Sequence, residues 1–125
     1  LDQFKNNITK YQMLITYNGS SFDLPYIKRL FPGIQLPSIH IDLKHLMRRA
    51  GFSGGLKAIE KQLGIVRNGG INGMNGYDAV RLWYYYKMGD RSALNILIKY
   101  NTADIVNLKP IIEAGYRILK KRLLP

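Results

Sequence analysis

At 125 residues the chain is one domain at most, with room for a core of modest size. Its 19 Lys and Arg outnumber its 8 Asp and Glu, and the net charge of +11 favours a polyanionic partner, most simply nucleic acid, over a membrane surface or an ordinary solvated face. The absence of cysteine excludes disulfides and thiolate metal sites, and no signal peptide or membrane-spanning apolar run is present, so we expect a cytoplasmic protein without a membrane partner.

The N-terminal part predicts the end of a helix, a strand, a turn and a second helix. Leu1, Phe4 and Ile8 have helical spacing, and the apolar run 13–15 is bounded by turn residues, as in a buried strand of a parallel sheet. The segment 22–31 then predicts a helix that ends at Pro32-Gly33. Its inward positions are Leu24, Ile27, Leu30 and Phe31.

Asp23 follows this first strand at the point where ligands bind in parallel sheets. It also lies two residues before Pro25, a pattern that starts and caps a helix without any chemistry. Both interpretations of Asp23, helix cap and functional carboxylate, stay open from this stretch alone.

A second strand is predicted at 39–42, where Ile alternates with polar residues. Asp42 ends it and is first interpreted as the N-cap of a helix over 43–49, with an accessory role near a metal site as the second interpretation. A short helix follows over 56–63, and Gly64 caps it.

The stretch 67–76 is rich in Gly and Asn and predicts a mobile connection, because it lacks the Gly-Lys-Ser/Thr ending of a phosphate-binding loop. A helix over 77–88 comes next, with an apolar stripe of Tyr77, Val80, Trp83, Tyr84 and Met88. Packing in the core or against a partner explains this stripe better than base stacking, since consecutive helical residues point in different directions.

The last part predicts a long helix over 90–108, interrupted near 107–109 by Pro110 and then resumed. Tyr100 and Asp104 are four residues apart, so both lie on one helix face. Lys120, Lys121 and Arg122 place a basic patch at the end of the chain, where cations also suit a helix C-terminus.

Two of these stretches together resemble the DnaQ-like 3′–5′ exonucleases of the ribonuclease H-like superfamily. Asn18-Gly19 and Phe22-Asp23-Leu24-Pro25-Tyr26 are similar to their second motif, and Tyr100 to Asp104 matches the Tyr-x-x-x-Asp third motif of the DEDD-type tyrosine subclass. Ile41-Asp42-Leu43, Gly55-Leu56-Lys57 and Gly64-Ile65 resemble an uncharacterised prokaryotic subgroup.

The resemblance implies a fold, a reaction and a set of site residues. The fold would be a partial ribonuclease H-like α/β domain, with helices packed around a small, largely parallel sheet. The reaction would be phosphodiester hydrolysis with two Mg²⁺ or Mn²⁺ ions. Asp104 and Asp23 would be metal ligands, Tyr100 would orient the attacking water, and Asn18 and Phe22 would line the path of the substrate strand.

The first motif of that family, Asp-x-Glu, does not occur in the 125 residues. We therefore expect residues 1–125 to be a single domain whose N-terminal strands lie upstream, with weak ion binding at best and no hydrolysis by this chain alone. We also expect a homodimer, because an exposed sheet edge next to 13–17 would leave backbone groups unpaired.

Two other interpretations remain. The same fold can act as a non-catalytic nucleic-acid-binding module, or both motif matches are coincidental and the chain is a basic structural protein. Neither DNA or RNA as substrate nor the polarity of cleavage follows from the sequence.

Overall fold

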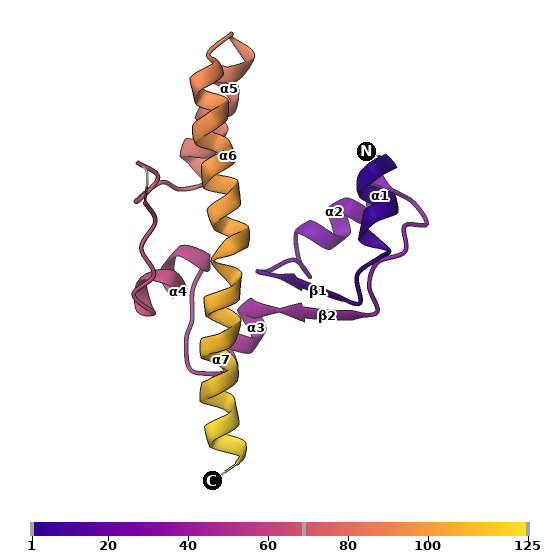
Figure 1. Ribbon diagram of the computed structural model, residues 1–125, viewed down its shortest axis with the longest axis vertical. Coiled ribbons are helices and arrows are strands. Elements are labelled where there is room, and N and C mark those ends of the chain that lie inside the picture. The colour runs from indigo at the N-terminus through magenta and orange to yellow at the C-terminus, as the bar shows by residue number, and fades with distance from the viewer. Residues whose placement is uncertain (1, 69, 125) are drawn as a thin grey trace.

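The computed structural model describes residues 2–68 and 70–124, so the predictions for Leu1 and Gly69 lie outside the described residues. A small sheet with short helices lies beside a long helical rod (Figure 1). The elements in chain order are α1 (Asp2–Ile8), β1 (Met13–Thr16), α2 (Asp23–Leu30), β2 (Ile39–Asp42), α3 (Leu43–Arg49), α4 (Leu56–Gln62), α5 (Gly76–Lys87), α6 (Arg91–Val106) and α7 (Leu108–Leu123).

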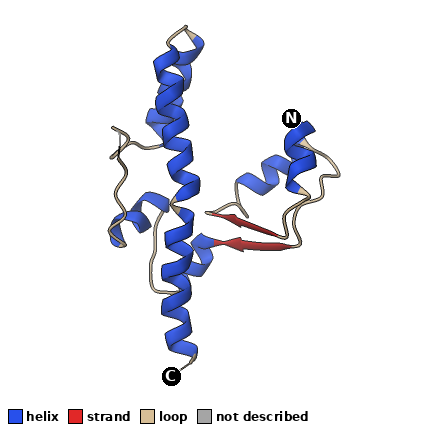
Figure 2. Cartoon of the chain, in the orientation of Figure 1, coloured by secondary structure: helices blue, strands red, loops and turns tan. Residues whose placement is uncertain are grey.

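The sheet consists of β1 and β2, which run parallel with Met13 paired to Ile39 and Thr16 paired to Asp42. Parallel neighbours need a crossover, and α2 provides it. Both strands end on the side of the sheet that faces the rod (Figure 2). The predicted α/β class with a small parallel sheet is confirmed, and β2 and α3 begin and end where the sequence predicts.

The core lies where α3 and α4 meet α7. Leu43, Met47, Ile59 and Ile111 are fully buried there, one pair on α3 and one residue each on α4 and α7. Side chains around them are partly buried: Ile15, Tyr17, Ile41, Leu46, Phe52, Leu56, Leu63, Ile65, Leu108 and Ile112. Gly115 brings α7 close to α3, since a Cβ there would lie 2.5 Å from Leu46 Cδ2 and 2.8 Å from Met47 Sδ.

The rod is formed by α6 and α7, which follow each other with only Asn107 between them. Pro110 falls in the first turn of α7, where its missing N–H leaves no helical hydrogen bond unmade. The predicted interruption at Pro110 is therefore confirmed as the start of a new helix. None of the helices within 2–68 and 70–124 has the length and apolar composition that crossing a bilayer requires.

At the α6 end of the rod, α5 folds back along α6 as a helical hairpin (Figure 1). Asn75 starts α5 with a capping box, in which its side chain accepts from Asp78 N and Asp78 accepts from Asn75 N, both at 3.0 Å. The stripe predicted to pack in the core or against a partner does not pack in the core of this chain, and packing against a partner stays a prediction. Tyr77, Val80, Tyr84 and Met88 are 80%, 55%, 61% and 76% exposed, because α6 covers the opposite face of α5.

A smaller correction concerns α2. Leu24 and Ile27 are partly buried as predicted, but Leu30 is 55% exposed. Phe31, just after the helix, packs instead against Phe4 of α1, with ring centroids 5.8 Å apart.

Candidate functional site

Tyr100 and Asp104 lie one turn apart on the face of α6 that turns toward α4 and Arg67. Tyr100 is 4% exposed, whereas the Asp104 side chain is 34% exposed. The two residues that resemble the third motif thus lie together, with the tyrosine ring buried and the aspartate side chain partly exposed.

Arg67 connects this face of α6 to α4. Its Nε and Nη2 donate to the two oxygens of Glu60 at 2.8 and 2.5 Å, and both side chains are about 5% exposed. Nη2 also lies 2.6 Å from Asp104 Oδ1, although that oxygen has no well-aligned donor among the described residues, so the contact is an ion pair. The bond to Glu60 raises the pKa of the Arg67 guanidinium above its ordinary value, which keeps Arg67 charged in spite of burial.

Lys57 is the second cation, after Arg67, that contacts Asp104 and Tyr100. Its Nζ lies 3.9 Å from Asp104 Oδ1 and 4.6 Å from the centroid of the Tyr100 ring, while Arg67 Cζ lies 5.3 Å from the same centroid. Both cations therefore contact the ring and the carboxylate of the third motif. Glu60 Oε1 accepts a further hydrogen bond from Asn107 Nδ2 at 3.1 Å, which ties the cluster to the joint between α6 and α7.

A second buried carboxylate, Asp42, organises the turn after β1. It accepts from Asn18 N at 2.8 Å, Ser20 N at 3.1 Å and the Ser20 hydroxyl, and it caps α3 by accepting from Lys44 N at 3.1 Å. This confirms the N-cap interpretation. Burial opposes the ionisation of Asp42, but the bonds from Ser20, Asn18 and Lys44 outweigh it and hold the pKa of Asp42 below its ordinary value.

The second-motif residues lie on that turn. Asn18 adopts a left-handed backbone with φ of 64°, which the bond to Asp42 supports. Phe22 is 68% exposed and occupies the N-cap position of α2, and Asp23 is the exposed first residue of the helix. The interpretation of Asp23 as the cap is therefore wrong, although a carboxylate in the first turn still suits the helix dipole.

These carboxylates by themselves do not fit a two-ion centre. Within 2–68 and 70–124, no three His, Cys, Asp or Glu side chains gather closely enough to hold a metal ion. Asp104 Oδ1 already faces the guanidinium of Arg67 and the ammonium of Lys57, which occupy the side from which a cation would approach. We therefore assign no metal-dependent step to the residues of this chain.

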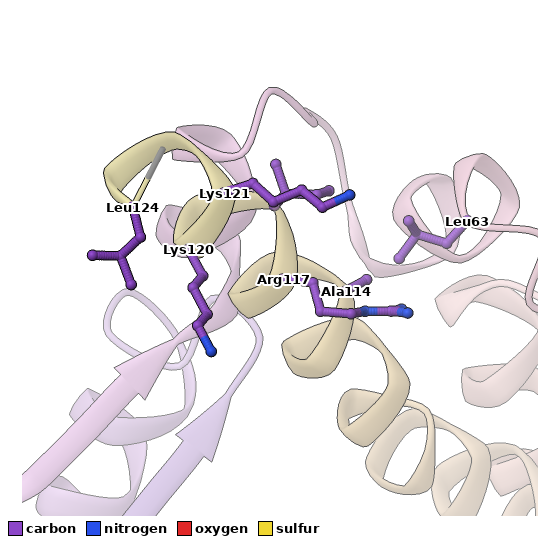
Figure 3. A pocket seen from close by; sticks show the side chains of 7 residues that line it. Leu63, Ala114, Arg117, Lys120, Lys121 and Leu124 are labelled. Carbon is purple, nitrogen blue, oxygen red and sulfur yellow. The ribbon is translucent and has the colours of Figure 1, made fainter.

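A basic pocket of about 540 Å³ lies between α7 and the end of α4. Leu63, Ala114, Ile118 and Leu124 give it an apolar lining, and no acidic side chain lines it. Figure 3 shows its cations, Arg117, Lys120 and Lys121, which all extend from α7.

Comparison with known families identifies the class of this protein. The family described as RNase_H superfamily matches residues 1–116, and the chain belongs to that superfamily. Its members act on nucleic acid, and its nucleases generally use divalent metal ions. No curated protein and no solved structure gives a significant match.

The sequence predicted that Tyr100 and Asp104 share a helix face, which is confirmed, but it did not indicate that Arg67 pairs with both Asp104 and Glu60. Glu60 follows the buried Ile59 in a short helix, and Arg67 lies beyond the turn at Gly64, whose φ is 74°. The signal in the sequence was Glu60 beside the apolar positions of α4. A charged residue at such a position indicates a buried ion pair only when its partner is known.

Proposed function

We propose that this chain is an exonuclease-like domain of the DEDD type, tyrosine subclass, which acts on the phosphodiester backbone of nucleic acid in the 3′–5′ direction as part of a complete metal-dependent site. The supporting observation is that Tyr100 and Asp104 share one face of α6, with the four-residue spacing of the motif that they resemble. Asp23, Asn18 and Phe22, on the turn after β1, are the other proposed site residues.

We further propose that the 125-residue chain is catalytically silent. Hydrolysis with two ions needs carboxylates that bridge them, and the chain has no Asp-x-Glu. Asp104 is neutralised by Arg67 and Lys57, so it offers little net negative charge to a cation. Mg²⁺ or Mn²⁺ binding by this chain is expected to be weak.

The alternative is a nucleic-acid-binding module with the same fold and no hydrolysis. The ion pair between Arg67 and Asp104 favours it, because a carboxylate that is already paired with a guanidinium has less negative charge to offer a metal ion. Both proposals require binding to a phosphate backbone, for which the pocket lined by Arg117, Lys120 and Lys121 supplies three cations on one helix.

One experiment tests binding to nucleic acid, and another tests whether the chain hydrolyses it. Binding of a fluorescent single-stranded oligonucleotide is measured for the wild type, for K120E/K121E and for K87E/R91E, which changes the charge equally on the hairpin. We expect K120E/K121E alone to lose about tenfold in affinity, and the slope of log K against log salt to fall by about 1.4 if two phosphate contacts are lost. An equal loss in both variants would contradict binding through this pocket.

The absence of catalytic activity is tested by incubating the chain with the same oligonucleotide, labelled at its 5′ end, in the presence of Mn²⁺. We expect no shortened products and no pair of tight sites in a Mn²⁺ titration by calorimetry. Stepwise shortening that disappears in D104N would instead make this chain an enzyme by itself. The homodimer through the sheet edge that the sequence predicts is one of the outcomes that the association experiment below distinguishes.

A further inference from the structure

The chain exposes far more surface than a compact protein of its mass. Its accessible surface is 9123 Å² at 14.3 kDa. A compact monomer of that mass exposes about 6,800 Å². The difference is roughly 2,300 Å², which exceeds the roughly 800 Å² that each partner buries in an interface of ordinary size.

A large share of the exposed apolar surface lies on the hairpin of α5 and α6. Tyr77, Val80, Tyr84 and Met88 recur at helical spacing and form one stripe along the outer face of α5, with exposed fractions between 55% and 80%. Trp83 and Tyr85, beside the stripe, are 44% and 43% exposed. A contiguous apolar stripe of this kind on a surface helix indicates an interface.

Charge indicates what covers the stripe. Residues 76–106 contain four Lys or Arg and three Asp, so they hold only one of the eleven net positive charges of the chain. A surface that binds nucleic acid by stacking combines its aromatic rings with a strongly basic groove, and this one is nearly neutral. A nearly neutral, aromatic surface instead suits contact between protein chains.

The position of the hairpin favours a second copy of the same chain. It forms one end of the rod, while the basic C-terminal end of α7 lies at the other (Figure 1). Two copies that meet through their hairpins keep their basic ends apart, so the repulsion between two chains of charge +11 is screened by salt over that distance. Contact through any surface close to α7 would bring those charges together.

We propose that two copies of this chain associate through the outer faces of their α5 helices, so that their two apolar stripes pack against each other. Tyr84, in the middle third of the stripe, is the central contact, and Met88 lies at the end of the stripe. This proposal does not depend on the proposed nuclease ancestry.

Sedimentation velocity at micromolar concentrations tests it with Y84D and with M13D, a matched substitution at the sheet edge, where Met13 is 44% exposed. We expect the wild type and M13D to be dimers and Y84D to be a monomer. Because both positions are exposed, the variants are expected to keep the fold, and circular dichroism checks this. The chain has no cysteine, so Y84C is a clean site for a bismaleimide cross-link, with K61C on α4 as the control.

Each other result overturns the proposal. A monomeric wild type shows that the hairpin has no self-partner. A dimer that M13D dissociates and Y84D does not places the interface at the sheet edge. A loss of oligonucleotide affinity in Y84D without any change in association assigns the stripe to nucleic acid.

Discussion

Arg67 is the residue on which the candidate site depends most. Arg67 is buried with Glu60 and also pairs with Asp104. Its removal therefore leaves the Glu60 carboxylate, which is 3% exposed, with only Asn107 as a hydrogen-bond partner. We predict that R67M lowers the free energy of unfolding by about 3–5 kcal/mol. Urea denaturation of R67M and the wild type measures this difference in the free energy of unfolding.

The control for this prediction removes both charges. An apolar pair of similar volume commonly replaces a buried ion pair without loss, so E60L/R67M is expected to recover most of the stability. If the double variant is as unstable as R67M, the loss comes from packing rather than from the unpaired charge of Glu60.

Asp42 makes the turn after β1 sensitive to acid. Its pKa is lowered in the folded protein, so its carboxylate stabilises the fold above its unfolded pKa of about 3.9, and this contribution is lost as the pH falls through the folded value. We predict that D42N is less stable than the wild type at neutral pH and that the difference shrinks below a pH of about 4.

Urea denaturation over this pH range measures the effect, with D2N on the exposed surface of α1 as the control. A difference between D42N and the wild type that is constant with pH would show that the amide disturbs the turn by its geometry alone.

Single residues also show the limit of sequence reasoning. Asp42 as a helix cap and Tyr100 with Asp104 on one face follow from local spacing, which is fixed by the helix itself. The pairing of Glu60 with Arg67 and Asp104 joins three segments, and no local pattern determines which of the 19 cations a buried carboxylate meets.

Among the elements, α3 and α7 approach each other closely at Gly115. A methyl group at Gly115 would overlap Leu46 and Met47, so we predict that G115A lowers the free energy of unfolding by about 1–3 kcal/mol. G76A, at the open first turn of α5, is the matched control and is expected to be neutral or slightly stabilising. Thermal denaturation of both variants measures the difference, and equal stability would mean that α3 and α7 separate at no cost.

The elements themselves were largely predictable. Apolar periodicity, Asp42 before α3 and Gly64 after α4 locate them to within a residue or two, because these signals act within one turn of chain. The orientation of α5 was not predictable in the same way. Periodicity shows that Tyr77, Tyr84 and Met88 share a face, but only the packing of α6 decides that this face is left uncovered.

At the scale of the molecule, composition indicated the class of partner and the structure shows how the charge is distributed. Ten of the eleven net charges lie outside the α5–α6 hairpin, and the basic pocket lies on α7. The chain therefore separates an apolar end from a basic end along one rod (Figure 1). Net charge alone predicts nucleic acid, but it cannot predict such a separation.

The joint at Asn107 gives this rod a mechanical property. Asn107 is the single residue between its two helices, and its side chain is hydrogen-bonded to Glu60, the same carboxylate that pairs with Arg67. Loss of the Glu60 carboxylate would therefore free two groups at once: the Asn107 side chain at the joint, and the Arg67 guanidinium, which would keep Asp104 as its carboxylate partner.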